Sequence, residues 1–308
     1  MWARCALPAL RRCGKSWHDG PRVKLAVVGL GLIGGSFARA LRAAGQVSSI
    51  RGYDADERQR RLAVDLGVVD AAPGSTAEAV ADADLVVLAV PVLRTAEAMA
   101  AVLPALKAGA VVTDVGSTKQ SVLADVQAVC GALPPWFVAG HPIAGTEKSG
   151  VAASNAELFR NKRLILSPHA AQDAGALALV RGLWESVGAR VVEMDASRHD
   201  AIFAATSHLP HVLAYAFVDM LSRLGDAEEI FANAGGGFRD FTRIASSSPR
   251  MWHDIVRANR ESVAGLLEQQ IAELSELLGL IRDEQWPALQ ARFERARNAR
   301  EQHLAHIE

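Results

Sequence analysis

The sequence predicts an α/β fold, a doubly wound parallel sheet, over residues 23–194, followed by an all-helical domain over residues 195–308. Three observations support this division. Short runs of β-forming residues alternate with amphipathic segments up to residue 194, a pattern typical of a parallel sheet covered by helices. A glycine-rich turn joins the first of these runs to the first amphipathic segment. Beyond Asp195 the β-forming runs stop, and apolar residues recur at helical spacing.

The first strand, expected at residues 23–28, leads into a turn with the pattern G-x-G-x-x-G. In this pattern one glycine permits a tight turn, one lets the backbone approach a pyrophosphate, and one lets the helix pack closely on the strand. Free N–H groups at the start of the following helix attract phosphate. The turn therefore predicts a dinucleotide site of the Rossmann type, formed by Gly29, Leu30, Gly31, Leu32, Ile33 and Gly34.

An acidic residue follows this turn at the distance that the fingerprint requires. The second strand is expected to end at Asp54, about 20 residues beyond the turn. Its carboxylate would bind the ribose hydroxyls of the adenosine and repel a 2′-phosphate, which favours NAD over NADP. Arg51 and Arg58 lie nearby in the sequence, so NADP remains the weaker alternative.

Five apolar runs predict the remaining strands, at residues 85–90, 110–115, 136–139, 164–167 and 190–194. Helices are expected between them, at about 56–66, 95–106, 120–129 and 174–187. The run at 85–90 is apolar throughout, as expected for a strand that is covered on both faces. Because Pro91 closes this run, we expect the backbone of Val90 and Pro91 near the adenine of the cofactor.

The last third of the chain predicts helices at 199–224, with an interruption near Pro210, and at 259–281 and 286–303. Residues 259–281 carry a regular apolar stripe, which can pack within the chain or against a partner. Because the helical domain is short and has many such stripes, we expect a homodimer that packs through these helices.

Composition excludes several classes of function. The formal net charge of −1 gives no case for binding nucleic acid or an acidic membrane surface, and no uninterrupted apolar run approaches the roughly 18 residues of a membrane span. The three cysteines lack metal-site spacing, which predicts a reduced, cytoplasmic protein. Residues 1–22 are rich in arginine like an organelle transit peptide, but we prefer a disordered extension or a misassigned start.

Two loops that leave strand ends carry residues suited to chemistry. Ligands of open α/β sheets bind beyond the carboxyl ends of the strands, where we expect the loops 114–119 and 140–147. His141 lies between Gly140 and Pro142, where it could act as an acid or base. Ser117 could hydrogen-bond His141 or the substrate. The alternative is that His141 only caps its loop.

The helical domain adds four further candidates. His208 and His211 are three residues apart and share a helix face. No cysteine or acid at ligand spacing accompanies them, so an anionic substrate is preferred over a metal. Arg243 has the fork geometry that binds a carboxylate, and Asp240 could orient it. The alternative is an exposed Arg–Asp pair that contributes little.

At these motifs the chain resembles the prephenate/arogenate dehydrogenases. The likeness runs from about Lys24 to Trp286 and rests on GLGLIGGS (29–36), DVGSTK (114–119), GHPIAGTEKSG (140–150), ATSHLPH (205–211) and GGGFRDFTRIA (235–245). It implies an enzyme of tyrosine biosynthesis that converts prephenate and NAD into 4-hydroxyphenylpyruvate, CO₂ and NADH, or arogenate into tyrosine. The reaction that the resemblance implies requires no metal, because the cofactor accepts the electrons.

The resemblance also implies a role for each matching residue. His141 takes the proton of the ring hydroxyl, Ser117 positions His141 and the nicotinamide, and Arg243 binds a substrate carboxylate. The other implied pocket residues are Thr146, Glu147, Ser207, His208, His211 and Trp252, with Asp240 holding Arg243.

Two other functions compete with this interpretation. The β-hydroxyacid dehydrogenases also join a Rossmann domain to a helical domain, but they use a lysine in a mid-chain helix. The nearest candidate here, Lys162, precedes a predicted strand. The second alternative is a non-catalytic sensor that binds NAD on the same scaffold. The choice between prephenate and arogenate stays open.

Overall fold

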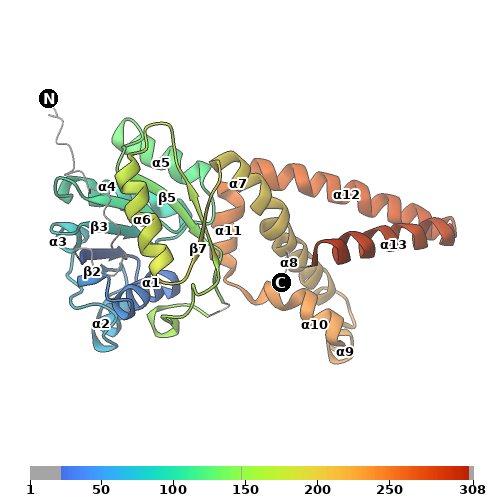
Figure 1. The fold of residues 1–308 in the computed structure, drawn as a ribbon. Helices are drawn as coiled ribbons and strands as arrows, with labels where there is room; N and C mark the ends of the chain where they lie inside the picture. Colours follow the sequence, from blue (N-terminus) through green and yellow to red (C-terminus); the bar gives the residue numbers. More distant parts are fainter. Residues whose placement is uncertain (1–21, 147, 305–308) are drawn as a thin grey trace. The chain divides into compact units, whose positions relative to one another are not determined.

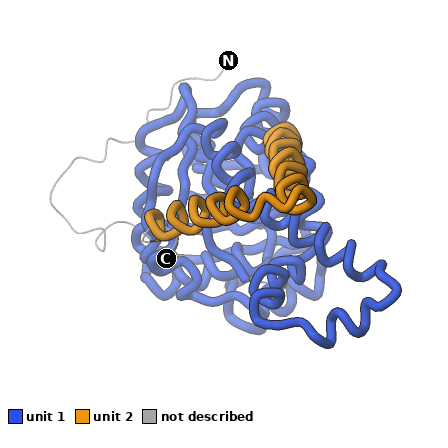
Figure 2. The backbone as a smooth tube through the Cα atoms, turned by 90° about the vertical axis from the view of Figure 1, so that its right-hand side faces the viewer, with its two compact units in different colours: residues 1–259 blue, residues 260–308 orange. Residues whose placement is uncertain are grey.

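The computed structural model describes residues 22–146 and 148–304, so the expected extension lies outside it up to residue 21. The chain divides into two compact units after Asn259 (Figure 2). Residues 195–259 thus share a unit with the sheet, and hydrogen bonds tie Asp200 to the backbone of Lys119 and Gln120. The domain boundary after residue 194 stays a prediction.

A seven-stranded sheet with the order β2-β1-β3-β4-β5-β6-β7 forms the centre of the first unit (Figure 1). Its strands are β1 (Val23–Val28), β2 (Val47–Tyr53), β3 (Leu85–Leu88), β4 (Val111–Asp114), β5 (Phe137–Pro142), β6 (Arg163–Ser167) and β7 (Arg190–Glu193). The strands β1 to β5 are parallel, as predicted.

The prediction of a fully parallel sheet is wrong for the last two strands, β6 and β7. β6 runs antiparallel to β5, and β7 is parallel to β6. A parallel connection usually needs a crossover helix. Between β5 and β6, the described residues contain only one short 3₁₀ turn, η4 (Val151–Ala153). The chain therefore returns to the edge of the sheet that it has just left, with His141 paired to Ile165.

Helices cover both faces of the sheet. They are α1 (Leu32–Ala43), α2 (Glu57–Asp65), α3 (Thr76–Val80), α4 (Thr95–Val102), α5 (Gln120–Cys130) and α6 (Ala174–Ser186), with the 3₁₀ turns η2 (Val92–Arg94) and η3 (Leu103–Ala105). Phe37 of α1 stacks on Trp184 of α6 in one buried cluster, and Met99 and Val126 lie in the other. Successive strand residues point to opposite clusters, as the continuous apolar runs predicted.

The chain after the sheet is helical, as predicted. Its elements are α7 (Ala196–Phe203), the π-helical turn η5 (Ala204–His208), α8 (Leu209–Ser222), α9 (Ala227–Ala232), α10 (Gly236–Thr242), the 3₁₀ turn η6 (Arg243–Ser246) and α11 (Pro249–Ala258). The predicted interruption near Pro210 is the π-helical turn. Proline removes one backbone donor and crowds the carbonyl four residues earlier, which the wider turn relieves.

Residues 196–222 form one helical segment that is long and apolar enough to cross a membrane by length and composition. Its most apolar 18-residue window has a mean hydropathy of 1.4 and is 17% buried. No uninterrupted apolar run in the sequence predicts such a segment. It carries three buried polar side chains, His199, Asp200 and His208, which hydrogen-bond to other elements. This bonding is typical of a helix packed in a protein, so the segment is weak evidence for a membrane span.

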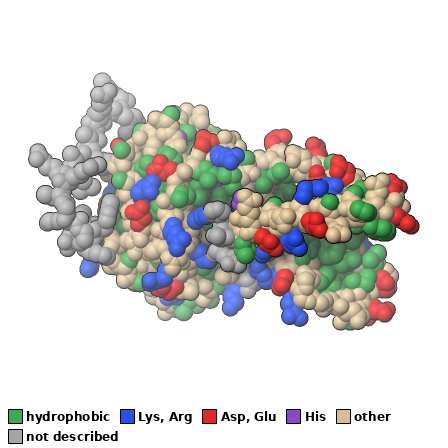
Figure 3. Space-filling model, turned by 45° about the vertical axis from the view of Figure 1, so that its right-hand side comes forward, with side chains coloured by type: hydrophobic (Ala, Val, Ile, Leu, Met, Phe, Trp, Pro, Cys, Tyr) green, Lys and Arg blue, Asp and Glu red, His purple; other side chains and the backbone are tan. Residues whose placement is uncertain are grey.

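The second unit consists of α12 (Arg260–Arg282) and α13 (Trp286–Gln302). Arg292 of α13 forms ion pairs with Glu273 and Glu276 of α12, which hold the two helices side by side. Large apolar side chains lie exposed on both helices: Ile271, Leu274, Leu278, Ile281, Trp286 and Phe293. Figure 3 shows apolar side chains exposed among charged ones on the helical part of the chain.

Candidate functional site

The glycine turn after β1 has the geometry that the dinucleotide fingerprint requires. Gly29 has a φ of +104°, and a Cβ there would lie 2.2 Å from the carbonyl oxygen of Ala89. A Cβ on Gly34 would lie 2.2 Å from the carbonyl oxygen of Gly29. At Gly31, which precedes α1, a Cβ would meet nothing within 4 Å. The turn is thus closed by the backbone on one side and leaves room for a pyrophosphate at the helix start.

Asp54 lies directly beside this turn. Its Oδ2 accepts a hydrogen bond from the Leu30 backbone N–H at 2.8 Å, and its Oδ1 accepts from the Asp56 N–H at 2.9 Å. Val90 crosses the same turn, with its backbone nitrogen 3.1 Å from the position of a Gly29 Cβ. The predicted cofactor residues therefore converge at the carboxyl ends of β1, β2 and β3, and they fit a dinucleotide.

A buried ion pair organises the neighbouring loop after β4. Lys119 Nζ donates to Asp114 Oδ2 at 2.5 Å and to the Gly140 carbonyl oxygen at 2.6 Å. Asp114 Oδ1 accepts from the Gly140 N–H at 3.0 Å. Burial lowers the pKa of Lys119, and the charge of Asp114 opposes that shift. The pair anchors the backbone of β5 immediately before His141.

His141 is half-buried near the end of β5, and its ring contacts helix α7. Its Nδ1 lies 2.8 Å from Nε2 of His199, whose Nδ1 lies 2.7 Å from Oδ1 of Asp200. Phe203 packs against both rings. Burial holds the pKa of His141 well below 6.5, and the neighbouring His199, Lys119 and His208 lower it further. His141 is therefore neutral at neutral pH, as a general base must be.

The predicted hydrogen bond between Ser117 and His141 is not formed. Within the described residues, the Ser117 side chain has no hydrogen-bond partner, and the ring of His141 is bonded to His199 instead. Neither His199 nor Asp200 is among the site residues that the sequence predicts. The only signal was the adjacent His–Asp pair at the start of the helical domain.

Asp200 is fixed by the start of α5. Its Oδ1 accepts from the Lys119 N–H at 2.7 Å, and its Oδ2 accepts from the Gln120 N–H at 2.9 Å. Burial raises the pKa of Asp200, but hydrogen bonds from His199 and these two amides outweigh it and lower the pKa. Asp200 is therefore a carboxylate that caps a helix.

The predicted histidine pair gathers around Trp252. The rings of His211 and Trp252 stack with centroids 3.5 Å apart, and the ring of His208 lies edge-on at 6.1 Å. His208 is buried, and burial lowers its pKa to about 4. Burial is also the first cause of the lowered pKa of His211, whose Nδ1–H donates to the Ser207 carbonyl oxygen. Both histidines thus offer neutral rings at neutral pH.

The indole nitrogen of Trp252 has no hydrogen-bond partner among the described residues of this cluster. Trp252 is buried, and its Nε1 has no hydrogen-bond partner within residues 22–146 and 148–304. His208 differs, since its Nδ1 faces the Asn259 amide nitrogen at 3.2 Å. Asn259 also donates to the backbone oxygen of Asp200. A buried, unsatisfied N–H is costly, so it marks a place where a ligand could bind.

Arg243 is the first residue of η6 and is exposed. Burial is the main cause of the lowered pKa of His211, and the charge of Arg243 lowers it further. The predicted pairing with Asp240 is not formed, since no ion pair joins them in the described part of the chain. Helix α10 ends at Thr242, so the two residues do not share one helix. Thr146 is exposed and accepts from the Lys148 N–H, while Glu147 lies outside the described residues.

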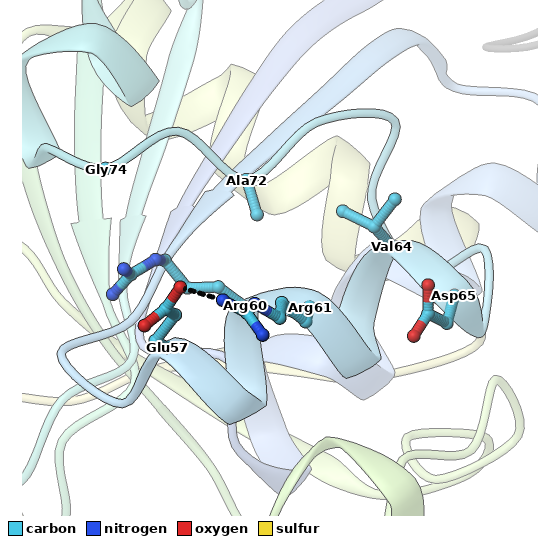
Figure 4. A pocket seen from close by; sticks show the side chains of 7 residues that line it. All are labelled: Glu57, Arg60, Arg61, Val64, Asp65, Ala72 and Gly74. Carbon is cyan, nitrogen blue, oxygen red and sulfur yellow. Dashed lines mark hydrogen bonds and ion pairs between the residues drawn. The ribbon is translucent and has the colours of Figure 1, made fainter.

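Metal ligands and surface hollows do not add to this site. Across the described ranges, no three His, Cys, Asp or Glu side chains are grouped as a metal site would require. A hollow of about 470 Å³ lies along α2 and contains none of the predicted site residues (Figure 4). It is lined by Glu57, Arg60, Arg61, Val64, Asp65, Ala72 and Gly74.

Two family models match the chain. Residues 37–193 match the prephenate dehydrogenase nucleotide-binding domain, and residues 195–295 match the prephenate dehydrogenase dimerization domain. A cyclohexadienyl dehydrogenase of Zymomonas mobilis is 39% identical over 90% of this chain and 94% of the relative. A prephenate dehydrogenase of Bacillus subtilis is 36% identical over 89% of this chain and 74% of its own length.

Solved structures show the same likeness. Prephenate dehydrogenase from Aquifex aeolicus, in complex with hydroxyphenyl propionate and NAD⁺, matches with a TM-score of 0.85 and 38% identity over 92% of this chain and 99% of that chain. Synechocystis arogenate dehydrogenase matches with a TM-score of 0.76 and 28% identity, covering 91% and 99%. A 3-hydroxyisobutyrate dehydrogenase from Mycobacterium tuberculosis, at 15% identity and a TM-score of 0.54, shares the fold alone.

Proposed function

Because this chain belongs to the prephenate dehydrogenase family, we propose that it catalyses the NAD-dependent oxidative decarboxylation of prephenate in tyrosine biosynthesis. The product is 4-hydroxyphenylpyruvate; arogenate, which gives tyrosine, is the alternative substrate. One observation carries the proposal: a neutral, half-buried histidine, His141, lies at the carboxyl edge of the sheet. That edge is where open α/β sheets bind their ligands.

The residues of the glycine turn would hold NAD. Gly31 leaves room for the pyrophosphate at the start of α1, and Asp54 lies where it can accept bonds from the adenosine ribose. When bound, NAD supplies the acceptor for the hydride that leaves the substrate. NADP remains the weaker alternative, because a 2′-phosphate would meet the carboxylate of Asp54.

His141 performs the proton transfer in this proposal. Its Nε2 takes the proton of the C4 hydroxyl as the hydride leaves C4, and a carbonyl forms there. The C–C bond to the ring carboxylate then breaks, its electron pair enters the ring, and CO₂ departs. The ring becomes aromatic, and its C4 oxygen takes the proton back from His141. Protons and electrons therefore balance without a further reactant.

Arg243 and the rings around Trp252 would bind the substrate. Arg243 is an exposed cation without an ion-pair partner in the described ranges, and so it is available to a carboxylate. His208, His211 and the free Nε1–H of Trp252 would hydrogen-bond the substrate as neutral groups. On the resemblance, we assign Ser117, Thr146 and Ser207 to the same pocket.

The test is reduction of the nicotinamide by the purified protein. NAD or NADP would be combined with prephenate or arogenate, and absorbance at the wavelength of the reduced cofactor would be followed. Rapid reduction of NAD with either acid supports the proposal, and the ratio between the acids gives the substrate. Binding of NAD without reduction in any combination would favour the non-catalytic sensor. Oxidation of a simple 3-hydroxy acid would favour the β-hydroxyacid dehydrogenases, although Lys162 is exposed and directly precedes β6.

Replacing Asp54 with Ala should change the choice of cofactor. The variant loses the ribose contact and the repulsion of a 2′-phosphate, so we expect the KM for NAD to rise about tenfold, as for one lost hydrogen bond. The preference for NAD over NADP should fall by at least that factor. The control is Asp56→Asn, which keeps a side-chain cap on α2. An unchanged NAD preference in Asp54→Ala would remove Asp54 from the cofactor site.

We also propose a cytoplasmic homodimer that packs through α12 and α13. The support is the match to a dimerization domain and the large apolar side chains that lie exposed on both helices. Sedimentation at micromolar concentration should give a dimer, and the double variant Ile271→Glu, Leu274→Glu should give a monomer, because charges would enter an apolar interface. Glu268→Gln, at an exposed position, is the control. A wild-type protein that sediments only as a monomer contradicts this assembly.

A further inference from the structure

We propose that His199 and Asp200 are positioning residues that fix His141 in the tautomer with a free Nε2 lone pair. This inference rests on the proposed function, since the lone pair matters only if His141 takes a proton from the substrate. The observation behind it is a chain of two hydrogen bonds through three side chains. Nδ1 of His141 lies 2.8 Å from Nε2 of His199, and Nδ1 of His199 lies 2.7 Å from Oδ1 of Asp200.

The proton on each ring follows from the end of this chain. A carboxylate only accepts hydrogen bonds, so Nδ1 of His199 must carry a proton toward Asp200. Burial lowers the pKa of His199, and the adjacent Asp200 only partly opposes it, so the ring is neutral at neutral pH. Nε2 of His199 then holds a lone pair and must accept from Nδ1–H of His141. A neutral His141 with its proton on Nδ1 has a free Nε2.

Several elements hold this arrangement rigid. The Asp200 carboxylate accepts hydrogen bonds from two backbone N–H groups at the start of α5. The side-chain amide of Asn259 donates to the backbone oxygen of Asp200. Lys119 connects Asp200 to the backbone of β5. Its backbone N–H donates to Asp200, and its Nζ donates to the carbonyl oxygen of Gly140, the residue before His141. The backbone next to His141 and the ring of His141 are thus held by separate hydrogen bonds, and such support is typical of a positioned catalytic group.

The charges around His141 give Asp200 a second task. Lys119 comes from the loop after β4 and is neutralised by Asp114, and His208 comes from η5. His199 and Asp200 come from α7. When His141 accepts a proton, Asp200 is the carboxylate that reaches it through His199. The bond from Nδ1–H then stabilises the positive charge, as a carboxylate does for the histidine of a serine protease triad.

The tautomer can be measured directly in the full-length protein labelled with ¹⁵N-histidine. Long-range ¹H–¹⁵N spectra distinguish a ring protonated at Nδ1 from one protonated at Nε2, and the signal missing in His141→Asn assigns the residue. We expect the Nδ1–H form of His141 in the wild type and in His199→Gln, which keeps an acceptor and a donor. His199→Leu removes the acceptor, and Nε2–H should appear. Phe203→Leu, which alters packing against both rings, should keep the Nδ1–H form.

Kinetics give the second readout. In His199→Leu we expect kcat to fall about 10²–10³-fold, since a triad histidine in the wrong tautomer costs up to about 10⁴. The KM for prephenate and NAD should change less than about threefold, and the acid limb of the pH profile should move to lower pH, because the protonated ring loses its acceptor. His199→Gln should restore most of kcat.

Each outcome decides the proposal. A wild-type His141 protonated on Nε2 overturns it, even if His199→Leu does not fold. So does an unchanged kcat in a folded His199→Leu variant, or a loss that His199→Gln does not restore. If the wild type reduces neither cofactor with either acid, the proposed function fails, but the spectra still decide the hydrogen-bond chain.

Discussion

Replacing His141 with Asn should lower kcat about 10²–10⁴-fold, the range for a lost general base. Asparagine cannot take the proton, but its amide can still donate to His199, so the fold and the KM values should change little. Steady-state kinetics with prephenate and NAD test this, with the exposed His253→Asn as the matched control. Near-normal turnover in His141→Asn would remove His141 from its role.

The same residue predicts the pH dependence. His141 must be neutral to act, and burial holds its pKa well below 6.5. The activity kcat/KM should therefore stay level as the pH falls from 7 through 6.5, and decline only below that, when His141 becomes protonated. An acid limb at 6.5 or above would show that the histidine is not shielded as the structure indicates.

Replacing Arg243 with Ala should raise the KM for the substrate strongly, by about 2–5 kcal/mol in binding free energy, the usual effect of truncating one partner of a charge pair that is buried in the complex. Arg243 is the exposed cation near His211, and the substrate brings carboxylates. The dissociation constant of the proposed product, 4-hydroxyphenylpyruvate, measured by calorimetry with NAD present, should rise in parallel, while kcat falls less.

Two further variants sharpen this test. Arg243→Lys keeps the charge but loses the planar fork, so it should lie between the wild type and Arg243→Ala. Arg239→Ala removes an exposed cation one turn earlier on α10 and should leave the KM unchanged. Equal KM values for Arg243→Ala and the wild type would place the carboxylate elsewhere.

The parts of the fold that were predicted depend on local signals. The strands β1, β3, β4 and β5 are largely buried and mostly apolar runs, and the turn at Gly29 carries its own fingerprint, so both can be read from neighbouring residues. The direction of β6 cannot, because it depends on the path of residues 143–162 through space. That path contains no crossover helix in its described part, and nothing in the apolar run at 164–167 distinguishes the two directions.

The candidate site shows the same limit. His141 could be selected because the sequence predicts a strand directly before it and special backbone residues, Gly140 and Pro142, on either side; the structure extends β5 through all three. His199 could not, since it bonds a residue 58 positions away and no spacing relates the two. The pairing of Asp240 with Arg243 was expected from helical spacing, but the helix ends between them. Burial of His208 likewise depends on Trp252 and Asn259, which come from a later part of the chain.

Asn259 ends the first compact unit and bonds both Asp200 and His208. The helices after residue 194 are therefore needed to build the surroundings of His141. A protein made of residues 22–194 alone would keep the glycine turn, Asp54 and His141, and so the means to bind a nucleotide. It would lack His199 and Phe203, the two side chains of the helices that contact the ring of His141. The residues that would bind the nucleotide therefore lie before residue 195, whereas the reactivity of His141 also depends on helices that follow it within the same compact unit.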